Sequence, residues 1–386
     1  MRILVLNYEY PPLGGGGGVA AANIAEEMAR LGHHVDYITS HFMGLERQEQ
    51  VNGVRVFREP VAGRKDYQTA SILSMLSFPA AAVRRAVALR READYDIIHT
   101  HFAIPSGPAG YILSKLWRKP HVLSVHGGDI YDPSKKYSPH RHPLLKLAVK
   151  RVLNQASTVV AQSKDIADRT VSIYRPKRPP LRIPLGFRTP RFAAADRAGL
   201  GLADGTVYAI AVSRLVPRKG YPELLAALAK CRSQRLVLLI AGDGPEAASL
   251  VRQCAELGIE GRVHFLGQVS EEQKYQYLSN ADIFCLATHH EGFGIVYQEA
   301  MHCGLPIVTT NVGGQTDFLT DGDNALLIDP CDVEGLAAGL DRLAGDEAER
   351  RRMGARNREI IREYMIDGVA RQYLLLFEEQ IARRKS

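Results

Sequence analysis

The sequence predicts an α/β protein of two domains, each built on a parallel β-sheet covered by helices. Short runs rich in aliphatic and β-branched residues alternate with longer segments of helical periodicity, which is the pattern of repeated βαβ units. The length of 386 residues exceeds what one hydrophobic core usually organises. Prolines also gather near the middle of the chain, where a connection between domains is expected. We therefore expect a first domain over residues 1–186 and a second over residues 187–365.

The first half begins with a strand at residues 3–6 and an unusual glycine run. The loop over residues 11–18 contains five consecutive glycines and precedes a helix from about residue 19 to residue 31. Such a loop lets the backbone approach a ligand closely, and a helix N-terminus offers free amide groups to an anion. Later strands of this half are expected at residues 35–39, 97–100, 121–125 and 158–161.

A nicotinamide-binding domain also places glycines between its first strand and helix. That class needs an acidic residue at the end of the second strand to bind the ribose. Here the second strand ends in Thr39, Ser40 and His41, and none of these is acidic. The sequence therefore disfavours a dinucleotide cofactor, and a merely structural loop remains an alternative.

The second half repeats the alternation after a proline-rich crossing. The prolines of the crossing are Pro176, Pro179, Pro180, Pro184 and Pro190. Strands are expected at residues 207–212, 236–241, 264–266, 283–286, 306–309 and 325–328. Ligands of open α/β sheets bind beyond the carboxyl ends of the strands, so we expect the two sheets to face each other across a cleft that holds one site.

Two glutamates mark the stretch on which the functional prediction depends. Glu291 lies in a glycine-containing loop, and Glu299 lies about one turn inside a helix expected to begin near Ile295. Phe293 and Gly294 leave the N-terminus of that helix open, which suits a phosphate. We interpret the stretch as part of a sugar-nucleotide site, with Glu291 facing the sugar and Glu299 facing the ribose. A simple acidic cap with a surface Glu299 is the alternative.

Two cations follow the first strand of the second half. Arg214 and Lys219 would lie at the carboxyl end of that sheet and could clamp a diphosphate, the arginine by a bidentate fork and the lysine as a point charge. Such a pair is also common on protein surfaces.

Composition excludes several classes of protein. The five cysteines show no C-x-x-C spacing, so they indicate reduced cysteines and not a disulfide framework or zinc finger. The N-terminus does not resemble a signal peptide, and we expect no segment that approaches a membrane span. Residues 1–185 hold 26 Lys and Arg against 15 Asp and Glu, which suggests an anionic partner for the first half. Without interleaved aromatic residues or a reading motif, nucleic acid is not expected.

Several short motifs together resemble a known family. They are residues 14–18 (GGGGG), 124–129 (SVHGGD), 213–215 (SRL), 219–220 (KG), 242–245 (GDGP), 291–294 (EGFG), 299–301 (EAM), 304–306 (GLP) and 313–314 (GG). Their order and spacing resemble the retaining glycosyltransferases of family four, which have two Rossmann-like domains in the GT-B architecture and an E-x7-E motif. The chain departs from the pattern in the hinge, at Leu185 and Arg188, and at Asp317, where the family often has Asn, Asp and Glu.

The resemblance implies transfer of a sugar from a nucleotide-diphosphate sugar to an acceptor hydroxyl with retention of configuration. It implies four catalytic residues: Arg214 and Lys219 on the diphosphate, Glu291 on the sugar, and His126 lining the sugar pocket. A packed or capping histidine is the alternative for His126. The implied donor-binding residues are Gly15, Gly16, Gly242, Phe293, Gly294 and Glu299. The resemblance also implies that a final helix, over residues 366–386, crosses back to the first domain.

No metal and no cofactor are expected. Some other glycosyltransferases hold a divalent cation with a D-x-D motif, and this chain has Asp94 and Asp96, then Asp321 and Asp323. Both pairs lie beside predicted strands, where aspartates are ordinary turn residues. We therefore expect transfer to survive chelation by EDTA.

The acceptor is the least defined part of the prediction. The resemblance and the basic first half favour a lipid-linked or surface-glycan precursor, as in polysaccharide biosynthesis. The protein is then expected in the cytoplasm or peripherally on the inner face of an anionic membrane, with Arg84, Arg85, Arg90 and Arg91 as candidate contacts. The alternative functions are a nucleotide-sugar epimerase or hydrolase, a phosphorylase on the same architecture, or a sugar-nucleotide-binding protein without catalysis.

Overall fold

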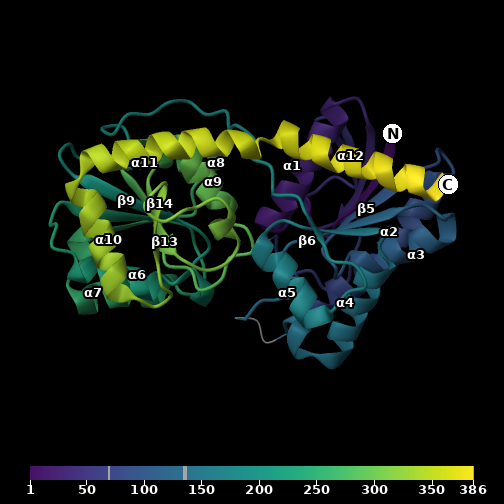
Figure 1. The fold of residues 1–386 in the computed structure, drawn as a ribbon, viewed down its shortest axis with the longest axis horizontal. Coiled ribbons are helices and arrows are strands. Elements are labelled where there is room, and N and C mark those ends of the chain that lie inside the picture. The colour runs from purple at the N-terminus through teal and green to yellow at the C-terminus, as the bar shows by residue number, and fades with distance from the viewer. Residues whose placement is uncertain (68–69, 134–136, 386) are drawn as a thin grey trace. The chain divides into compact units, whose positions relative to one another are not determined.

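The computed structural model describes residues 1–67, 70–133 and 137–385 of the chain. Its contacts form two compact units (Figure 1): unit 1 is Met1–Arg188 with Tyr364–Ser386, and unit 2 is Thr189–Glu363. The sequence placed the first boundary at residue 186, and unit 1 extends two residues further, to Arg188. Each unit contains its own β-sheet.

Unit 1 is built on an eight-stranded sheet. Its strands are β1 (Arg2–Leu6), β2 (His34–Ser40), β3 (Gln48–Val51), β4 (Val54–Glu59), β5 (Ile97–His101), β6 (His121–Val125), β7 (Thr158–Ala161) and β8 (Leu181–Arg182). Their order is β3-β4-β2-β1-β5-β6-β7-β8, and every pairing except β3 with β4 is parallel. The predicted parallel sheet is confirmed.

Three strands of unit 1 were not predicted. The antiparallel pair β3 and β4 is joined at Asn52 and Gly53, which both have positive φ, as a tight hairpin turn requires. Because β3 is polar, this hairpin at the edge of the sheet does not appear as an apolar run in the sequence. The short strand β8 lies within the proline-rich stretch, which the sequence analysis interpreted as a crossing without strands. That interpretation is wrong for residues 181–182.

The helices of unit 1 cover both faces of its sheet. They are α1 (Gly16–Arg30), α2 (Ile72–Arg90), α3 (Gly107–Trp117), η1 (Pro139–Arg141), α4 (Pro143–Gln155), α5 (Lys164–Tyr174) and α12 (Ile366–Lys385). One core cluster joins α1 and α12 to the sheet, and a second joins α2 and α3 to it. Helix α1 begins three residues earlier than expected, so the end of the glycine run forms its first turn.

Helix α12 packs on unit 1, as the sequence predicted. It lies beside α1 in Figure 1, and the two helices are in contact. Val369, Tyr373 and Phe377 are fully buried in the cluster that contains Ile3 of β1. The Tyr373 hydroxyl also lies 3.1 Å from the hydroxyl oxygen of Ser124, at the end of β6. The last helix is therefore part of the core of unit 1.

Unit 2 is built on a six-stranded parallel sheet. Its strands are β9 (Val207–Val212), β10 (Leu236–Ala241), β11 (Val263–Gly267), β12 (Ile283–Leu286), β13 (Ile307–Thr310) and β14 (Ala325–Ile328). All six strands were predicted, and their order is β11-β10-β9-β12-β13-β14. Successive strands run outward from β9 to one edge and from β12 to the other. The carboxyl ends of β9 and β12 are therefore the switch point at which ligands of such sheets bind.

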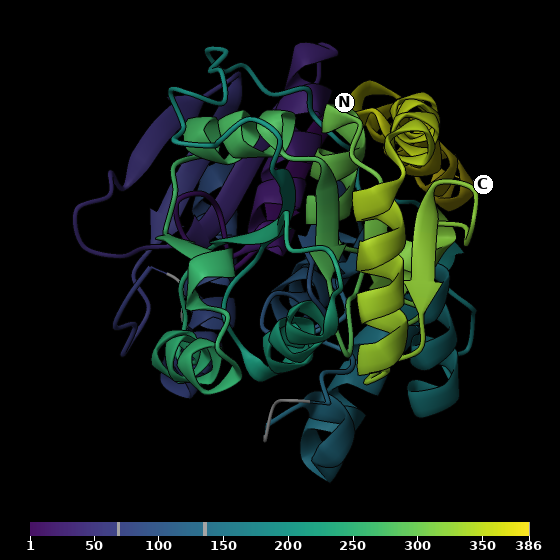
Figure 2. The same ribbon diagram turned by 90° about the vertical axis from the view of Figure 1, so that its left-hand side faces the viewer.

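The helices of unit 2 follow the strands in turn. They are η2 (Pro217–Lys219), α6 (Tyr221–Lys230), α7 (Ala247–Leu257), η3 (Glu260–Arg262), α8 (Glu271–Asn280), α9 (Ile295–Cys303), η4 (Gly314–Asp317), α10 (Val333–Gly345), α11 (Glu347–Ile360) and η5 (Ile361–Tyr364). Figure 2 turns unit 2 toward the viewer and shows α10 beside the edge strand β14; α10 also packs against α6. Helices α8 and α9 are in contact as well, which matters for the site below.

Helix α2 corrects one expectation. Among the described residues it is the one helix whose length and composition would suit a membrane span, with a mean hydropathy of 1.4 over 18 residues. The expectation that no segment approaches a span is therefore wrong. One such helix is weak evidence for a span, because a helix packed on a sheet passes the same test. The buried residues Phe78, Ala82 and Leu89 of α2 belong to a core cluster of unit 1.

The packing of α12 predicts a specific loss of stability. Phe377→Ala should lower the free energy of unfolding by about 3–5 kcal/mol, because it leaves a cavity in a fully buried cluster. Urea unfolding followed by circular dichroism would measure this. The matched control is Leu375→Ala, since Leu375 is 66% exposed on the same helix and should change stability by less than about 0.5 kcal/mol. Equal effects of the two substitutions would contradict the packing of α12.

Candidate functional site

An ion pair between Lys219 and Glu291 lies at the switch point of unit 2. Lys219 ends η2, which follows β9, and Glu291 lies in the loop between β12 and α9. The two loops approach so closely that a Cβ atom at Gly220 would overlap the carbonyl oxygen of Ala287. Only glycine permits this approach, and φ of Gly220 is +66° as well. The local backbone therefore brings the lysine to the glutamate.

Arg218 adds a second positive charge to this pair. Its guanidinium lies 3.6 Å from the Glu291 carboxylate and donates a hydrogen bond of 3.1 Å to the carbonyl oxygen of His290. Lys219 and Glu291 have side chains that are only 8% and 13% exposed. Burial alone would raise the pKa of Glu291, but the charges of Lys219 and Arg218 outweigh burial and lower that pKa to about 2. Two cations thus share one carboxylate, and a net positive charge remains.

The N-terminus of α9 is open, as predicted. The helix begins at Ile295, its N-cap is Gly294 with φ of +90°, and no side chain caps it. The alternative in which Glu291 is a simple helix cap is therefore wrong. Phe293 is buried against Phe318, with ring centroids 5.2 Å apart, so the loop before the helix is fixed by packing. A helix N-terminus held in this way can receive an anion.

Glu299 lies one turn inside α9 and is not a surface residue. Its carboxylate accepts a hydrogen bond of 2.7 Å from the ammonium group of Lys274 on α8, and both side chains are largely buried. Burial raises the pKa of Glu299, although the charge of Lys274 acts in the opposite direction. The two glutamates of the motif therefore each have a lysine partner from another loop or helix.

Arg214 and Gly242 lie in the loops that follow β9 and β10. The side chain of Arg214 is exposed, and it is Arg218 that lies beside Glu291. Gly242 lies in the loop after β10, where its amide donates to the carbonyl oxygen of Gly267 at 2.8 Å. This loop also contacts the loop after β9, because Leu215 donates to the carbonyl oxygen of Asp243 at 2.9 Å. Gly242 thus has a structural role of its own.

In unit 1, the glycine run lies next to His126. Gly15 is the N-cap of α1 and Gly16 is its first residue. A Cβ atom at Gly17 would lie 2.7 Å from the ring of Phe102 and 3.6 Å from Nδ1 of His126. The structure therefore brings the predicted residues Gly15, Gly16 and His126 into one region of unit 1.

Neighbouring acids and histidines hold this region. The Gly15 amide donates a hydrogen bond of 3.1 Å to the carboxylate of Glu9. The His126 backbone amide donates to Asp129 at 2.9 Å, and the two rings of His126 and His101 are joined by a hydrogen bond of 3.0 Å between Nε2 and Nδ1. Burial lowers the pKa of His126 to about 3. The imidazole is therefore neutral near pH 7 and can donate through only one nitrogen.

The two Asp-x-Asp pairs are engaged in structural contacts. Asp94 pairs with Lys119 at 2.8 Å, and Asp96 accepts the backbone amide of Arg2 at 2.7 Å. In unit 2, Asp321 accepts the amide of Leu327 at 2.9 Å, and Asp323 pairs with Arg356 at 3.0 Å. These contacts agree with the interpretation of the aspartates as turn residues.

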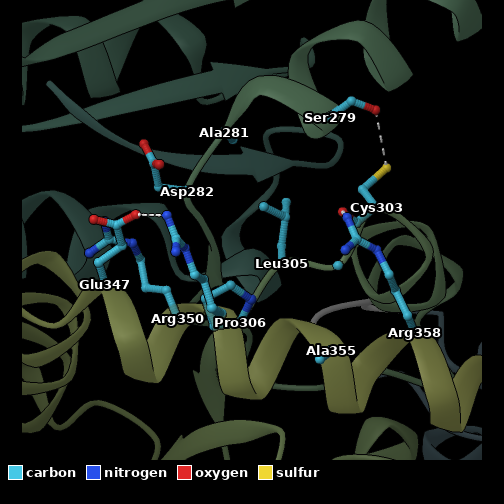
Figure 3. A pocket seen from close by; sticks show the side chains of 12 residues that line it. Ser279, Ala281, Asp282, Cys303, Leu305, Pro306, Glu347, Arg350, Ala355 and Arg358 are labelled. Atoms are coloured by element: carbon cyan, nitrogen blue, oxygen red, sulfur yellow. Dashed lines mark hydrogen bonds and ion pairs between the residues drawn. The ribbon is translucent and has the colours of Figure 1, made fainter. Parts of the chain in front are cut away.

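A pocket of about 310 Å³ lies at the other end of the unit-2 sheet (Figure 3). Its lining includes Asp282, which precedes β12, and Pro306, which precedes β13, so it opens at the amino ends of the strands. Arg350 and Arg358 of α11 also line it. Because ligands of open α/β sheets bind at the carboxyl ends, this pocket is not the candidate site.

Comparisons with known proteins bear on both units. Residues 15–186 match the family described as "Glycosyl transferase 4-like domain", and residues 193–360 match "Glycosyl transferases group 1". The D-inositol 3-phosphate glycosyltransferase of Nocardia farcinica is 30% identical over 393 residues, which cover 92% of this chain and 84% of the relative. The chain belongs to the family-four glycosyltransferases of GT-B architecture.

Solved structures show the same fold for this glycosyltransferase. The sucrose-phosphate synthase of Thermosynechococcus elongatus has a TM-score of 0.86 at 24% identity and covers 99% of this chain and 100% of its own. HepE of Anabaena in complex with UDP-glucose has a TM-score of 0.76 at 22% identity and covers 98% of this chain and 100% of its own.

Four residues of the glycosyltransferase escaped the sequence analysis. Arg218 had a visible signal, because it is the residue before the predicted Lys219. Lys274 had none, since only the contact between α8 and α9 brings it to Glu299. Glu9 lies in the loop after β1 and His101 ends β5. Glu9 contacts a backbone amide, and the partner of His101 is distant in sequence, so neither contact shows in the sequence.

The buried ion pair predicts a measurable coupling between two residues. Glu291→Gln should lower the free energy of unfolding by about 3 kcal/mol, because it leaves Lys219 buried without its carboxylate. The folded pKa of Glu291, about 2, lies below the unfolded value of about 4.3, so this difference should be complete above pH 5 and shrink as the pH falls toward 2.

The control for this prediction is the double variant Lys219→Met with Glu291→Gln. It removes both charges, so its unfolding free energy should be within about 1 kcal/mol of the wild type. Urea unfolding of the wild type, both single variants and the double variant completes the cycle. If the two single effects simply add, the pair is not coupled and this description of the site is wrong.

Proposed function

We propose that this glycosyltransferase moves a sugar from a nucleotide-diphosphate sugar to an acceptor hydroxyl with retention of configuration. One observation carries the proposal: Lys219, Arg218 and Glu291 meet at the switch point of unit 2, beside the open N-terminus of α9. This arrangement offers positive charge to a diphosphate and a carboxylate to the sugar attached to it.

The chemistry of the reaction explains why positive charge is needed. Breaking the bond between the sugar and the diphosphate leaves negative charge on the departing nucleotide. Fixed cations and helix N-termini aimed at that charge lower the barrier, because they need no reorganisation during the reaction. Lys219 and Arg218 together exceed the charge of Glu291, so the cluster stays cationic when the glutamate is ionised. Arg214, which lies in the same loop and is exposed, would bind the same diphosphate.

The remaining predicted residues would fix the donor in place. Glu299, oriented by Lys274, would accept hydrogen bonds from the ribose hydroxyls. The amides of Gly15, Gly16, Phe293 and Gly294 would contact phosphate oxygens.

In unit 1, donor binding would change existing contacts. Binding through the Gly15 amide requires the Glu9 carboxylate to release that amide. His126, neutral and tied to His101, would donate one hydrogen bond to a sugar hydroxyl.

Retention follows if the acceptor enters on the same face from which the nucleotide departs. The departing phosphate would then take the proton of the acceptor hydroxyl. Glu291 would stabilise charge on the reacting sugar and position it without forming a bond to it, since its carboxylate is paired with Lys219. We propose no metal in this step. The UDP-glucose bound to HepE favours the same donor class, but the nucleotide and the sugar of this chain need a direct screen with UDP, GDP and ADP sugars.

Substitution of the two glutamates tests the proposal. Glu291→Gln should lower the rate of transfer by about 100-fold or more, because it removes charge at the reacting sugar, and leave donor affinity within a few-fold. Glu299→Gln should weaken donor binding by about ten-fold, since one charged hydrogen bond to the ribose is lost. Steady-state kinetics with titration calorimetry of the donor would measure both. Equal and small effects would overturn the assignment, and transfer that stops in EDTA and returns with Mg²⁺ would overturn metal independence.

The same assay separates the alternatives. A sugar-nucleotide-binding protein without catalysis would bind a donor but neither hydrolyse nor transfer it. An epimerase would convert the donor with no acceptor present, and a hydrolase would release free sugar at full rate without one.

For the acceptor, we propose a lipid-linked glycan reached at an anionic membrane through α4. The arginines of α2 are poor candidates, because Arg84 and Arg85 both contact Glu59. Helix α4 instead exposes two leucines, Leu144 at 82% and Leu147 at 63%. The exposed cations of the same helix are Lys146, Lys150 and Arg151. Exposed apolar side chains among cations are typical of a helix that lies on an anionic membrane surface.

Vesicle binding tests this surface. The wild type should sediment with vesicles of phosphatidylglycerol and not with phosphatidylcholine, and less so at high salt. Leu144→Ser with Leu147→Ser should reduce binding by about ten-fold, because each leucine contributes buried apolar area. The control variant Arg84→Gln should bind like the wild type. No binding of the wild type to anionic vesicles would exclude the surface while leaving the transfer reaction untouched.

A further inference from the structure

Three side chains with metal-binding atoms meet at the carboxyl edge of the unit-2 sheet. Glu223 lies in the first turn of α6, His289 follows β12, and Cys331 lies between β14 and α10. One ligand atom of each lies within 4.8 Å of those of the other two. The residues are far apart in sequence, so no motif search would group them.

The hydrogen bonds of this cluster leave oxygen atoms unused. Nε2 of His289 lies 3.0 Å from Oε1 of Glu223. The other oxygen of Glu223, Oε2, is buried without a hydrogen-bond partner, and the same holds for Oε2 of the nearby Glu246. Buried polar atoms without partners are uncommon and indicate a missing ligand, water or ion.

The electrostatics of the cluster favour a cation. Glu246 lies close enough to Glu223 for the two carboxylates to repel each other. Glu246 is the N-cap of α7, so a second helix, besides α6, brings a carboxylate toward the cluster. Two acidic groups that repel each other in a partly buried place are stabilised by a positive ion between them.

Cys331 is not explained by packing. It is exposed, and its φ of +66° places it in the left-handed region that glycine normally occupies. A side chain in this conformation costs about 1 kcal/mol. The other described cysteines are at least partly buried, so Cys331 is the one among them whose thiol faces solvent beside a histidine and a carboxylate.

We propose that Glu223, His289 and Cys331 bind a zinc ion, with Glu246 or a water molecule as the fourth ligand. Carboxylate oxygen, imidazole nitrogen and thiolate sulfur are the donors that Zn²⁺ uses in proteins. Tetrahedral coordination at the usual bond lengths sets ligand atoms roughly 3.5 Å apart. The three ligand atoms lie within 4.8 Å of one another, so small side-chain rotations can bring them to this spacing. The histidine and the thiol favour Zn²⁺ over Mg²⁺ or Ca²⁺, which prefer oxygen ligands.

The ion would join helix α6 to two loops next to the proposed donor site. The His289 amide donates a hydrogen bond of 2.8 Å to the carbonyl oxygen of Arg218, so His289 is already tied to the loop that carries Lys219. Zinc would fix this connection to α6 and to the loop before α10. Its role is structural, it enters no step of sugar transfer, and the inference does not depend on the proposed function.

Titration of Zn²⁺ into chelator-treated, reduced and tag-free protein tests the proposal. Without nucleotide present, calorimetry should show one ion bound per chain, and Zn²⁺ should raise the melting temperature. Replacement by Co²⁺ should give the visible absorption of a tetrahedral site and a near-ultraviolet band from the thiolate. Cys331→Ser should remove that band, and His289→Ala and Glu223→Gln should each weaken Zn²⁺ binding at least ten-fold.

Matched controls come from the same unit. Cys303→Ser removes a cysteine that is partly buried elsewhere, and His264→Ala removes an exposed histidine, so both variants should bind Zn²⁺ like the wild type. Circular dichroism checks that each variant is folded. Failure of the wild type to bind Zn²⁺ would overturn the site even if every variant of the ligands failed to fold. An unchanged cobalt band in folded Cys331→Ser would overturn it as well.

Discussion

The buried ion pair between Lys219 and Glu291 is the interaction on which the candidate site depends. A lysine this buried needs a counter-charge, and the glutamate is supplied by the neighbouring strand at the switch point of the sheet. The pair therefore fixes the loops after β9 and β12 against each other. Lys219 and Glu291 neutralise each other, so Arg218 gives the cluster a net positive charge. The open N-terminus of α9 adds the partial positive charge of the helix dipole.

The two glutamates of the Glu291 to Glu299 stretch are held in different ways. The charges of Lys219 and Arg218 lower the pKa of Glu291 to about 2, so Glu291 is ionised near pH 7. Glu299 has a raised pKa because burial outweighs the single charge of Lys274. The first is suited to charge stabilisation at a reacting sugar, and the second to hydrogen bonding with hydroxyl groups. Spacing in the sequence places Glu291 in the loop before α9 and Glu299 on that helix, while their different tertiary partners give them different chemistry.

Much of this arrangement could be predicted from the sequence, for identifiable reasons. The strands of unit 2 are apolar runs, and α9 begins directly after a glycine. Local sequence patterns were therefore sufficient to predict the strands and the start of this helix. The contact of Lys274 with Glu299 was not predictable, because it depends on how α8 packs beside α9. Arg218 was missed, since a linear reading does not show which arginine of a short loop lies beside Glu291. The polar edge strand β3 was missed because its pairing, and not its composition, makes it a strand.

The central claim is that Lys219, held by Glu291, provides charge for a nucleoside diphosphate. Calorimetric titration of matched nucleoside diphosphates and monophosphates into the wild type and Lys219→Met tests it most directly. The wild type should prefer the diphosphate by about ten-fold or more, equivalent to about 1.4 kcal/mol, and Lys219→Met should lose most of that preference. An unchanged preference in folded Lys219→Met would contradict the claim.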